Sequence, residues 1–262
     1  MRLATNGLTL GYDLAGSGTA VLFLHAFPLN RRMWAAQVEA LRAPARPLTV
    51  DSRGFGESDP SPAPYGLETL GDDVLALAGK VGITRAIVVG LSMGGYVAFR
   101  LIERAPEFVQ ALVLADTRAE PDTPEGRAGR VMLADRVERD GLAALQQFMQ
   151  GLLGPTTRAS RPEVVTRLQQ AVGSPSPGAV AATLRAIADR PDSRPLLPAI
   201  TVPTLVLVGE EDALTTPDSA RVIAGGIRGA RLVIIPQAGH LSNLEAPDAF
   251  NHELVAFVRE LA

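Results

Sequence analysis

A serine enclosed by glycines is the residue of this 262-residue chain best suited to covalent chemistry. Ser92 lies in the run GLSMGG at residues 90–95, directly after an apolar stretch and directly before a helical pattern. A tight turn from strand to helix presents a serine hydroxyl, and flanking glycines let the two elements approach closely. The spacing therefore predicts a nucleophilic serine at the end of a strand.

A serine hydroxyl needs a base to take its proton, and the chain contains only three histidines. His240 follows the last apolar strand pattern, at the sheet edge where Ser92 should also lie, so we expect it to be that base. His252 falls within a terminal helical pattern, where a solvated or packed residue is expected. His25 ends an earlier apolar run, near the expected site.

A carboxylate should orient the imidazole from a loop at the same edge of the sheet. The apolar run 204–209 leads into Glu210, Glu211 and Asp212 before a helix start at Pro217. By residue type and position, each of these three acids could hold the histidine.

The amino-acid composition excludes several classes of protein for this chain. The chain has no cysteine, which excludes disulfides, a thiolate nucleophile and cysteine-based metal sites. A formal net charge of −3 provides no basic field for nucleic acid. With 47% hydrophobic residues, no signal-like segment and no apolar run of membrane length, we expect a globular, cytoplasmic protein without membrane contact.

The elements that must position these residues alternate along the chain. Short runs rich in Val, Ile and Leu alternate with longer helical patterns, which is typical of a parallel sheet joined by crossover helices. We expect strands at 8–13, 20–25, 47–51, 86–90, 111–116, 204–209 and 231–236, and helices at 67–81, 93–104, 217–224 and 247–261.

Residues 117–199 break this alternation. They contain helical pieces separated by Pro and Gly, with predicted helix starts at Ser160, through a capping box with Glu163, and at Ser176. Such a length is too great for an ordinary loop. We expect a helical cap, or lid, over a core formed by 1–116 and 200–262, although a helical layer without substrate contact is the alternative.

Three segments resemble the α/β-hydrolase fold family: GLSMGG at 90–95, GEED at 209–212 and AGH at 238–240. In that family, Gly-x-x-Asp and Gly-His carry an acid and a base, in the chain order Ser, Asp, His. The resemblance therefore selects Asp212 as the acid. It covers nearly the whole chain outside 117–199 and implies a mostly parallel central sheet with helices on both faces.

The same resemblance implies structural roles for other charged residues. Glu210 and Glu211 become solvated loop charges, with Glu211 as the fallback acid. The run DSRGFGES at 51–58 is similar to a family turn, in which we expect Asp51 to pair with Arg53.

The run HAFP at 25–28 resembles the family's His-Gly-x-Pro loop, with Ala26 in place of glycine. The resemblance implies that the backbone N–H groups of Phe27 and Met93 form an oxyanion hole. His25 would then hold this loop by a hydrogen bond. Candidate residues for an apolar substrate pocket are Leu29, Trp34, Met132 and Phe148.

The resulting hypothesis is a serine hydrolase that needs no cofactor or metal and cleaves a small carboxylic ester or lactone through an acyl-enzyme on Ser92. Within the family, the GLSMGG run and the compact cap look like small carboxylesterases and 3-oxoadipate enol-lactonases. The alternatives are a perhydrolase of the non-haem haloperoxidase type, an acyltransferase with the same triad, and a ligand receptor without turnover. The sequence leaves the acyl chain and the oligomeric state open.

Overall fold

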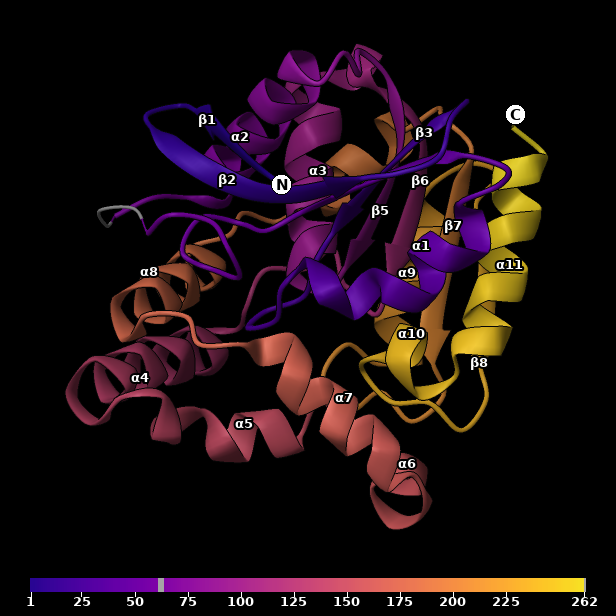
Figure 1. Ribbon diagram of the computed structural model, residues 1–262. Coiled ribbons are helices and arrows are strands. Elements are labelled where there is room, and N and C mark those ends of the chain that lie inside the picture. Colours follow the sequence, from indigo (N-terminus) through magenta and orange to yellow (C-terminus); the bar gives the residue numbers. More distant parts are fainter. Residues whose placement is uncertain (61–63, 262) are drawn as a thin grey trace.

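The chain is organised around one twisted sheet in the computed structural model, which describes residues 1–60 and 64–261 (Figure 1). Among these residues, eight strands pair in the order β1-β2-β4-β3-β5-β6-β7-β8. The pairs β1–β2 and β2–β4 are antiparallel, and the others are parallel. The strands are β1 (Arg2–Thr5), β2 (Leu8–Leu14), β3 (Ala20–Leu24), β4 (Arg46–Val50), β5 (Ala86–Leu91), β6 (Val109–Ala115), β7 (Thr204–Gly209) and β8 (Arg231–Ile235).

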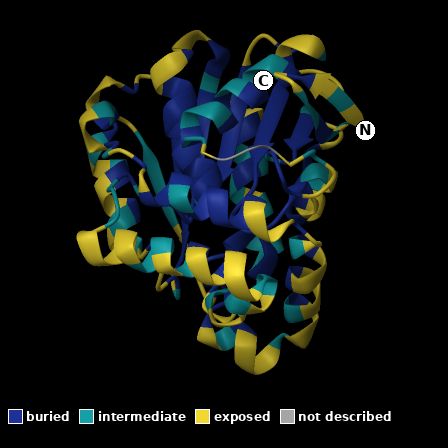
Figure 2. Cartoon of the chain, turned by 90° about the vertical axis from the view of Figure 1, so that its left-hand side faces the viewer, coloured by how far each residue is buried: buried dark blue, intermediate teal, exposed yellow. Residues whose placement is uncertain are grey.

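Helices cover both faces of the sheet, so its centre is buried on each side (Figures 1 and 2). Along β3, Leu22 packs into the apolar cluster beneath α2, α3 and α9, whereas Phe23 packs into the cluster beneath α1 and α11. These helices are α1 (Ala35–Leu41), α2 (Leu67–Lys80), α3 (Met93–Arg104), α9 (Pro217–Gly226) and α11 (Pro247–Arg259), with α10 (Ser242–Glu245) before the last. Short 3-10 helices are η1 (Arg31–Trp34), η2 (Pro106–Phe108), η3 (Leu142–Leu145) and η4 (Arg194–Ala199).

The predicted α/β-hydrolase fold is confirmed, and the seven predicted strands correspond to β2 through β8. The sequence patterns missed β1 and α1. β1 is a four-residue edge strand with a mixed polar sequence, and α1 has only seven residues, so neither shows a clear hydrophobic period.

Residues 117–199, all of which are described, contain five α-helices and no strand. In Figure 1 they lie together beyond the carboxyl ends of the parallel strands. The helices are α4 (Pro124–Asp140), α5 (Gln146–Gln150), α6 (Pro155–Ser160), α7 (Pro162–Val172) and α8 (Pro177–Ala188).

One of the two predicted helix starts in this segment is confirmed. Ser176 caps α8 by accepting a hydrogen bond from the Ala179 N–H at 3.2 Å. The start at Ser160 is wrong, because Ser160 ends α6 and its hydroxyl donates to a carbonyl within α6. Pro162 instead opens α7, since its fixed φ suits the first helical position.

The chain segments that lead into and out of the inserted helices meet at one buried carboxylate. Asp122 forms ion pairs with Arg118, Arg130 and, at 2.9 Å, Arg190. Burial alone would raise the pKa of Asp122, but the hydrogen bonds and charges of Arg190 and Arg130 outweigh burial and lower it. Asp122 is therefore charged at neutral pH and ties the two segments together.

Asp122→Asn should lower the free energy of unfolding by about 3 kcal/mol at pH 7, because it leaves the buried charge of Arg190 without its carboxylate partner. A carboxyl whose pKa is lower in the folded than in the unfolded state stabilises the fold above about pH 4 and loses that effect as the pH falls through its folded pKa. The difference between variant and wild type should therefore shrink at pH 3. Urea unfolding at both pH values measures it.

The matched control is Asp140→Asn, which removes an exposed pair with Arg139 and should leave the stability close to that of the wild type. An Asp122→Asn effect as small as that of the control at pH 7, or one that persists undiminished at pH 3, would contradict this account of the junction.

Candidate active site

Ser92 lies in the turn between β5 and α3, with φ 54° and ψ −113°. This is a left-handed conformation that a non-glycine residue rarely adopts. A Cβ atom at Gly90 would lie 2.3 Å from the carbonyl oxygen of Gly94, and one at Gly94 would lie 2.1 Å from that of Leu24. Gly90 is therefore required where β5 and α3 close around Ser92, as predicted, whereas Gly94 is required where α3 packs against the end of β3.

The structure brings together the three residues that the sequence selected as nucleophile, base and acid. His240 Nε2 lies 2.8 Å from Ser92 Oγ, and His240 Nδ1 lies 2.9 Å from Asp212 Oδ2. Each residue follows a different parallel strand, so the carboxyl edge of the sheet positions all three. They form one continuous chain of hydrogen bonds.

Asp212 is buried and fully engaged by donors. The N–H groups of Leu214 and Thr215 donate to Oδ1 at 2.8 and 2.9 Å, and the Thr215 hydroxyl donates to Oδ2 at 2.6 Å. Burial alone would raise the pKa of Asp212, but the charge of His240 and the hydrogen bonds from His240 and Thr215 outweigh burial and lower it. This environment keeps Asp212 ionised at neutral pH, as required to stabilise an imidazolium.

The two glutamates beside Asp212 have different environments. Glu210 is exposed, as predicted, and accepts a hydrogen bond from the Gln237 N–H at 3.2 Å. Glu211 corrects the prediction of a solvated charge: its carboxylate accepts from the Thr156 N–H at 2.9 Å and from the Thr156 hydroxyl. Because α6 engages this carboxylate, Glu211 anchors the inserted helices to the loop that carries Asp212.

The loop at residues 25–28 is held in place by His25. His25 Nε2 accepts from the Ser52 N–H at 2.9 Å, which leaves the Nδ1 proton to donate to the Ala26 carbonyl at 2.9 Å. Burial lowers the pKa of His25, so the ring is uncharged and structural, in agreement with the sequence. Ala26 has no left-handed φ, so replacement of the family's glycine causes no backbone strain.

Of the four candidate pocket residues, Phe148 is the one whose ring packs against the Phe27 ring. Phe148, from α5, packs edge-on against Phe27 with ring centroids 5.6 Å apart. Leu29 and Trp34 instead fill the apolar core between the sheet and α11. Met132 is 61% exposed, because the residues that α4 buries, Ala134 and Val137, lie on another side of the helix.

The family model for the alpha/beta hydrolase fold matches residues 19–247. The chain belongs to the α/β-hydrolase fold family. A thermophilic esterase from Thermogutta terrifontis is 38% identical, with a TM-score of 0.95 and coverage of 100% of this chain and 99% of that chain. The enol-lactonase from Burkholderia xenovorans LB400 is 32% identical, with a TM-score of 0.91 and coverage of 98% and 99%.

A curated relative, 3-oxoadipate enol-lactonase 2 of Acinetobacter baylyi, is 29% identical over 265 residues that cover 98% of this chain and 96% of the relative. This α/β hydrolase is therefore an enzyme of the hydrolase class. Within the described part of the chain, no helix has the length and apolar character needed to cross a bilayer.

The charged turn of this α/β hydrolase at residues 51–58 is paired differently from the prediction. The Asp51 carboxylate forms an ion pair with the Arg31 guanidinium and accepts a hydrogen bond from the Arg31 backbone N–H at 2.7 Å. Arg53 pairs instead with Asp73 of α2 at 2.7 Å. The predicted pair of Asp51 and Arg53 is therefore wrong, because each charge finds a buried partner on another element of the fold.

Sequence reasoning missed Thr215. Its hydroxyl lies 3.1 Å from His240 Nδ1 and also donates a hydrogen bond to Asp212 Oδ2. A threonine three residues after an aspartate is compatible with a turn in which the carboxylate accepts backbone N–H groups. That pattern alone does not distinguish a supporting residue of a site from an ordinary turn residue.

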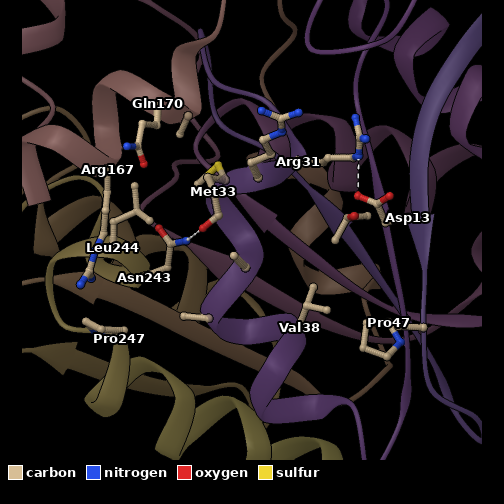
Figure 3. Close-up of a pocket in the computed structure, with 16 residues that line it drawn as sticks. Asp13, Arg31, Met33, Val38, Pro47, Arg167, Gln170, Asn243, Leu244 and Pro247 are labelled. Atoms are coloured by element: carbon tan, nitrogen blue, oxygen red, sulfur yellow. Dashed lines mark hydrogen bonds and ion pairs between the residues drawn. The ribbon is translucent and has the colours of Figure 1, made fainter. Parts of the chain in front are cut away.

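A groove of about 730 Å³ lies beside η1, α7 and α10, and Ser92, Asp212 and His240 do not line it (Figure 3). Asn243, three residues after His240, donates to the Met33 carbonyl at 2.9 Å in the groove wall. The Met33 sulfur in turn accepts from the Ala26 N–H at 3.2 Å. Met33, in the wall of this groove, therefore contacts both the segment after His240 and the loop at residues 25–28.

Proposed function

We propose that this hydrolase cleaves a small carboxylic ester or lactone through an acyl-enzyme on Ser92. The observation that carries the proposal is the continuous hydrogen-bond chain from Ser92 through His240 to the ionised Asp212. The names of the similar proteins, an esterase and enol-lactonases, support the substrate class.

In the first half of the reaction, Ser92 Oγ attacks the substrate carbonyl carbon while His240 Nε2 takes the hydroxyl proton. The tetrahedral intermediate then collapses, the bond to the leaving oxygen breaks, and His240 donates its proton to that oxygen. Asp212 holds the ring orientation and stabilises the transient imidazolium. For an ester the products of this half are a free alcohol and an ester on Ser92; for a lactone the new hydroxyl group stays on the acyl chain.

In the second half, His240 takes a proton from water as the water attacks the acyl carbon. Ser92 Oγ leaves and recovers a proton from His240, which releases the carboxylic acid. We assign the oxyanion hole to the N–H groups of Phe27 and Met93. Met93 supports this assignment because it begins α3, where backbone N–H groups lack helical partners.

Residues 117–199 form the cap in this proposal, over a core of 1–116 and 200–262. Two carboxylates support that role: Glu211 engages Thr156, and Glu245 accepts from the Gly154 N–H at 2.8 Å. The start of α6 is thereby bound to the Asp212 loop and to α10, which follows His240. Phe148 from α5 reaches Phe27 and would form a wall of the acyl pocket.

Phe148→Ala should shift the chain-length preference toward longer acyl groups, because removal of the ring opens space beside Phe27. We expect the ratio of kcat/KM for octanoyl over acetyl p-nitrophenyl esters to rise by about tenfold, in line with the value of one or more methylene contacts. The matched control is Met132→Ala on the exposed side of α4, which should leave the ratio unchanged. A wild-type ratio in Phe148→Ala would remove this residue from the pocket.

A panel of p-nitrophenyl esters from acetyl to octanoyl, together with an enol-lactone and with peroxide present or absent, tests the proposed function. We expect hydrolysis of short esters or of the lactone without peroxide. Product formation only with peroxide would favour a perhydrolase, and transfer to an added alcohol in preference to water would favour an acyltransferase. Saturable binding of these compounds without turnover would favour a receptor.

A further inference from the structure

A buried carboxylate that the proposed reaction does not use lies next to its acid and base. Asp116 directly follows β6 and is 0% exposed. Its φ of 43° is left-handed, a conformation that aspartate tolerates better than most residues. Its own N–H donates to the Leu207 carbonyl at 2.9 Å, which fixes its backbone against β7.

The Asp116 carboxylate joins two segments that are distant in the sequence. Oδ1 accepts from the Gly209 N–H at 2.8 Å, at the end of β7 and three residues before Asp212. Oδ2 accepts from the Ser242 N–H at 3.2 Å and from its hydroxyl at 2.5 Å, two residues after His240. One carboxylate therefore binds the segment that carries the acid and the segment that carries the base.

The chain that precedes His240 is also bound to the loop that carries Asp212. The Ala238 carbonyl, two residues before His240, accepts a hydrogen bond from the Glu211 N–H at 2.8 Å. This backbone bond joins the segment before His240 to the loop that carries Asp212. Asp116 binds the segment that follows His240, through Ser242. Burial and the charge of Asp212 raise the pKa of Asp116 well above its ordinary value, so the fold retains this group at an electrostatic cost.

We propose that Asp116 is a positioning residue that fixes the separation of Asp212 and His240 by holding the end of β7 to the turn after His240. This inference rests on the proposed function. Loss of Asp116 should loosen the hydrogen bond between Asp212 and His240 without removing either group. Substrate contacts remain in place, so the effect should fall on kcat and not on KM.

The test compares Asp116→Ala with Asp116→Asn in hydrolysis of p-nitrophenyl acetate, or of the best ester found. Rates are expressed per active site titrated with an organophosphonate. For Asp116→Ala we expect kcat to fall about 30-fold with KM within about twofold, and the midpoint of the kcat/KM pH profile to move to lower pH, because a looser Asp212 stabilises the imidazolium less. Asp116→Asn keeps an acceptor oxygen and should recover most of the rate.

The matched control is Asp73→Ala. Asp73 lies on α2, is 2% exposed and pairs with Arg53, so this variant removes a carboxylate that is buried to a similar extent. It should lower the thermal stability but leave kcat per titrated site and the pH midpoint unchanged. If Asp116→Ala does not fold, Ser242→Ala decides, because it removes the hydroxyl that donates to the Asp116 carboxylate. We then expect a smaller shift of the pH midpoint in the same direction.

A wild-type kcat and pH midpoint in folded Asp116→Ala, or a wild-type pH midpoint in Ser242→Ala where Asp116→Ala does not fold, would overturn the positioning role, as would equal losses in Asp116→Ala and Asp73→Ala. Failure of the underlying function has a different signature, since Ser92→Ala would then retain turnover. An inactive Ser92→Ala together with an unperturbed Asp116→Ala would refute the positioning role alone.

Discussion

Ser92→Ala should lower kcat for ester hydrolysis by about 10⁴-fold or more, with a melting temperature within a few degrees of the wild type. The rate falls because the alternative, direct attack by water, lacks the covalent intermediate. Steady-state kinetics on the best ester of the p-nitrophenyl panel, at equal concentrations of folded protein, measures the loss.

The fold should tolerate this change because the backbone of Ser92 makes its structural contacts. Its N–H donates to the Ala115 carbonyl at 3.0 Å, and its carbonyl accepts from the Thr117 hydroxyl at 2.9 Å. The side chain bonds only to His240 among the described contacts. Alanine is an L-residue like serine and faces the same strain at φ 54°.

Ser58→Ala is the control for Ser92→Ala, since the Ser58 hydroxyl bonds the Asp51 carbonyl and the Gly11 N–H, within the fold. This variant should lose some stability and keep its turnover per folded molecule. Normal hydrolysis by a folded Ser92→Ala protein would contradict the assignment of the nucleophile.

Asp212→Asn should lower kcat by about 10³- to 10⁴-fold, because an amide favours the wrong imidazole tautomer and cannot stabilise the imidazolium. Glu211→Gln is the matched control on the adjacent residue, whose carboxylate binds Thr156 of α6. We expect that variant to remain within a few-fold of the wild-type kcat. Kinetics of both variants with one ester decides between the two acids.

The opposite result, near-normal turnover in Asp212→Asn and a large loss in Glu211→Gln, would move the acid to Glu211. The hydrogen bond between Asp212 and His240 would then not be the one used in catalysis.

The sequence predicted the nucleophile turn well because its signals are local. An apolar run, two glycines and an immediate helix pattern already contain the geometry that the structure shows around Ser92. The acid was harder, since Glu210, Glu211 and Asp212 are adjacent and chemically equivalent. Their bond partners are distant in the sequence, Gln237 and His240 in the loop after β8 and Thr156 in α6, so only the family resemblance separated the three acids.

The missed residues depend on contacts between distant segments. Apolar side chains are predicted to be buried, but their type does not say whether they enter the core, as Trp34 does, or meet a loop, as Phe148 does. The pairing of Asp51 with Arg31 instead of Arg53 has the same origin. Asp116 was assigned only to a strand end, because its partners Gly209 and Ser242 are about a hundred residues away.

The most direct test of the acyl-enzyme hypothesis is to locate the covalent bond that an organophosphonate forms with the protein, by mass spectrometry of the intact chain and of its peptides. We expect one label per chain, on the peptide that contains Ser92, with activity lost in proportion to labelling and no label on Ser92→Ala. Stoichiometric labelling of another residue, or full esterase activity after complete labelling of Ser92, would contradict the account.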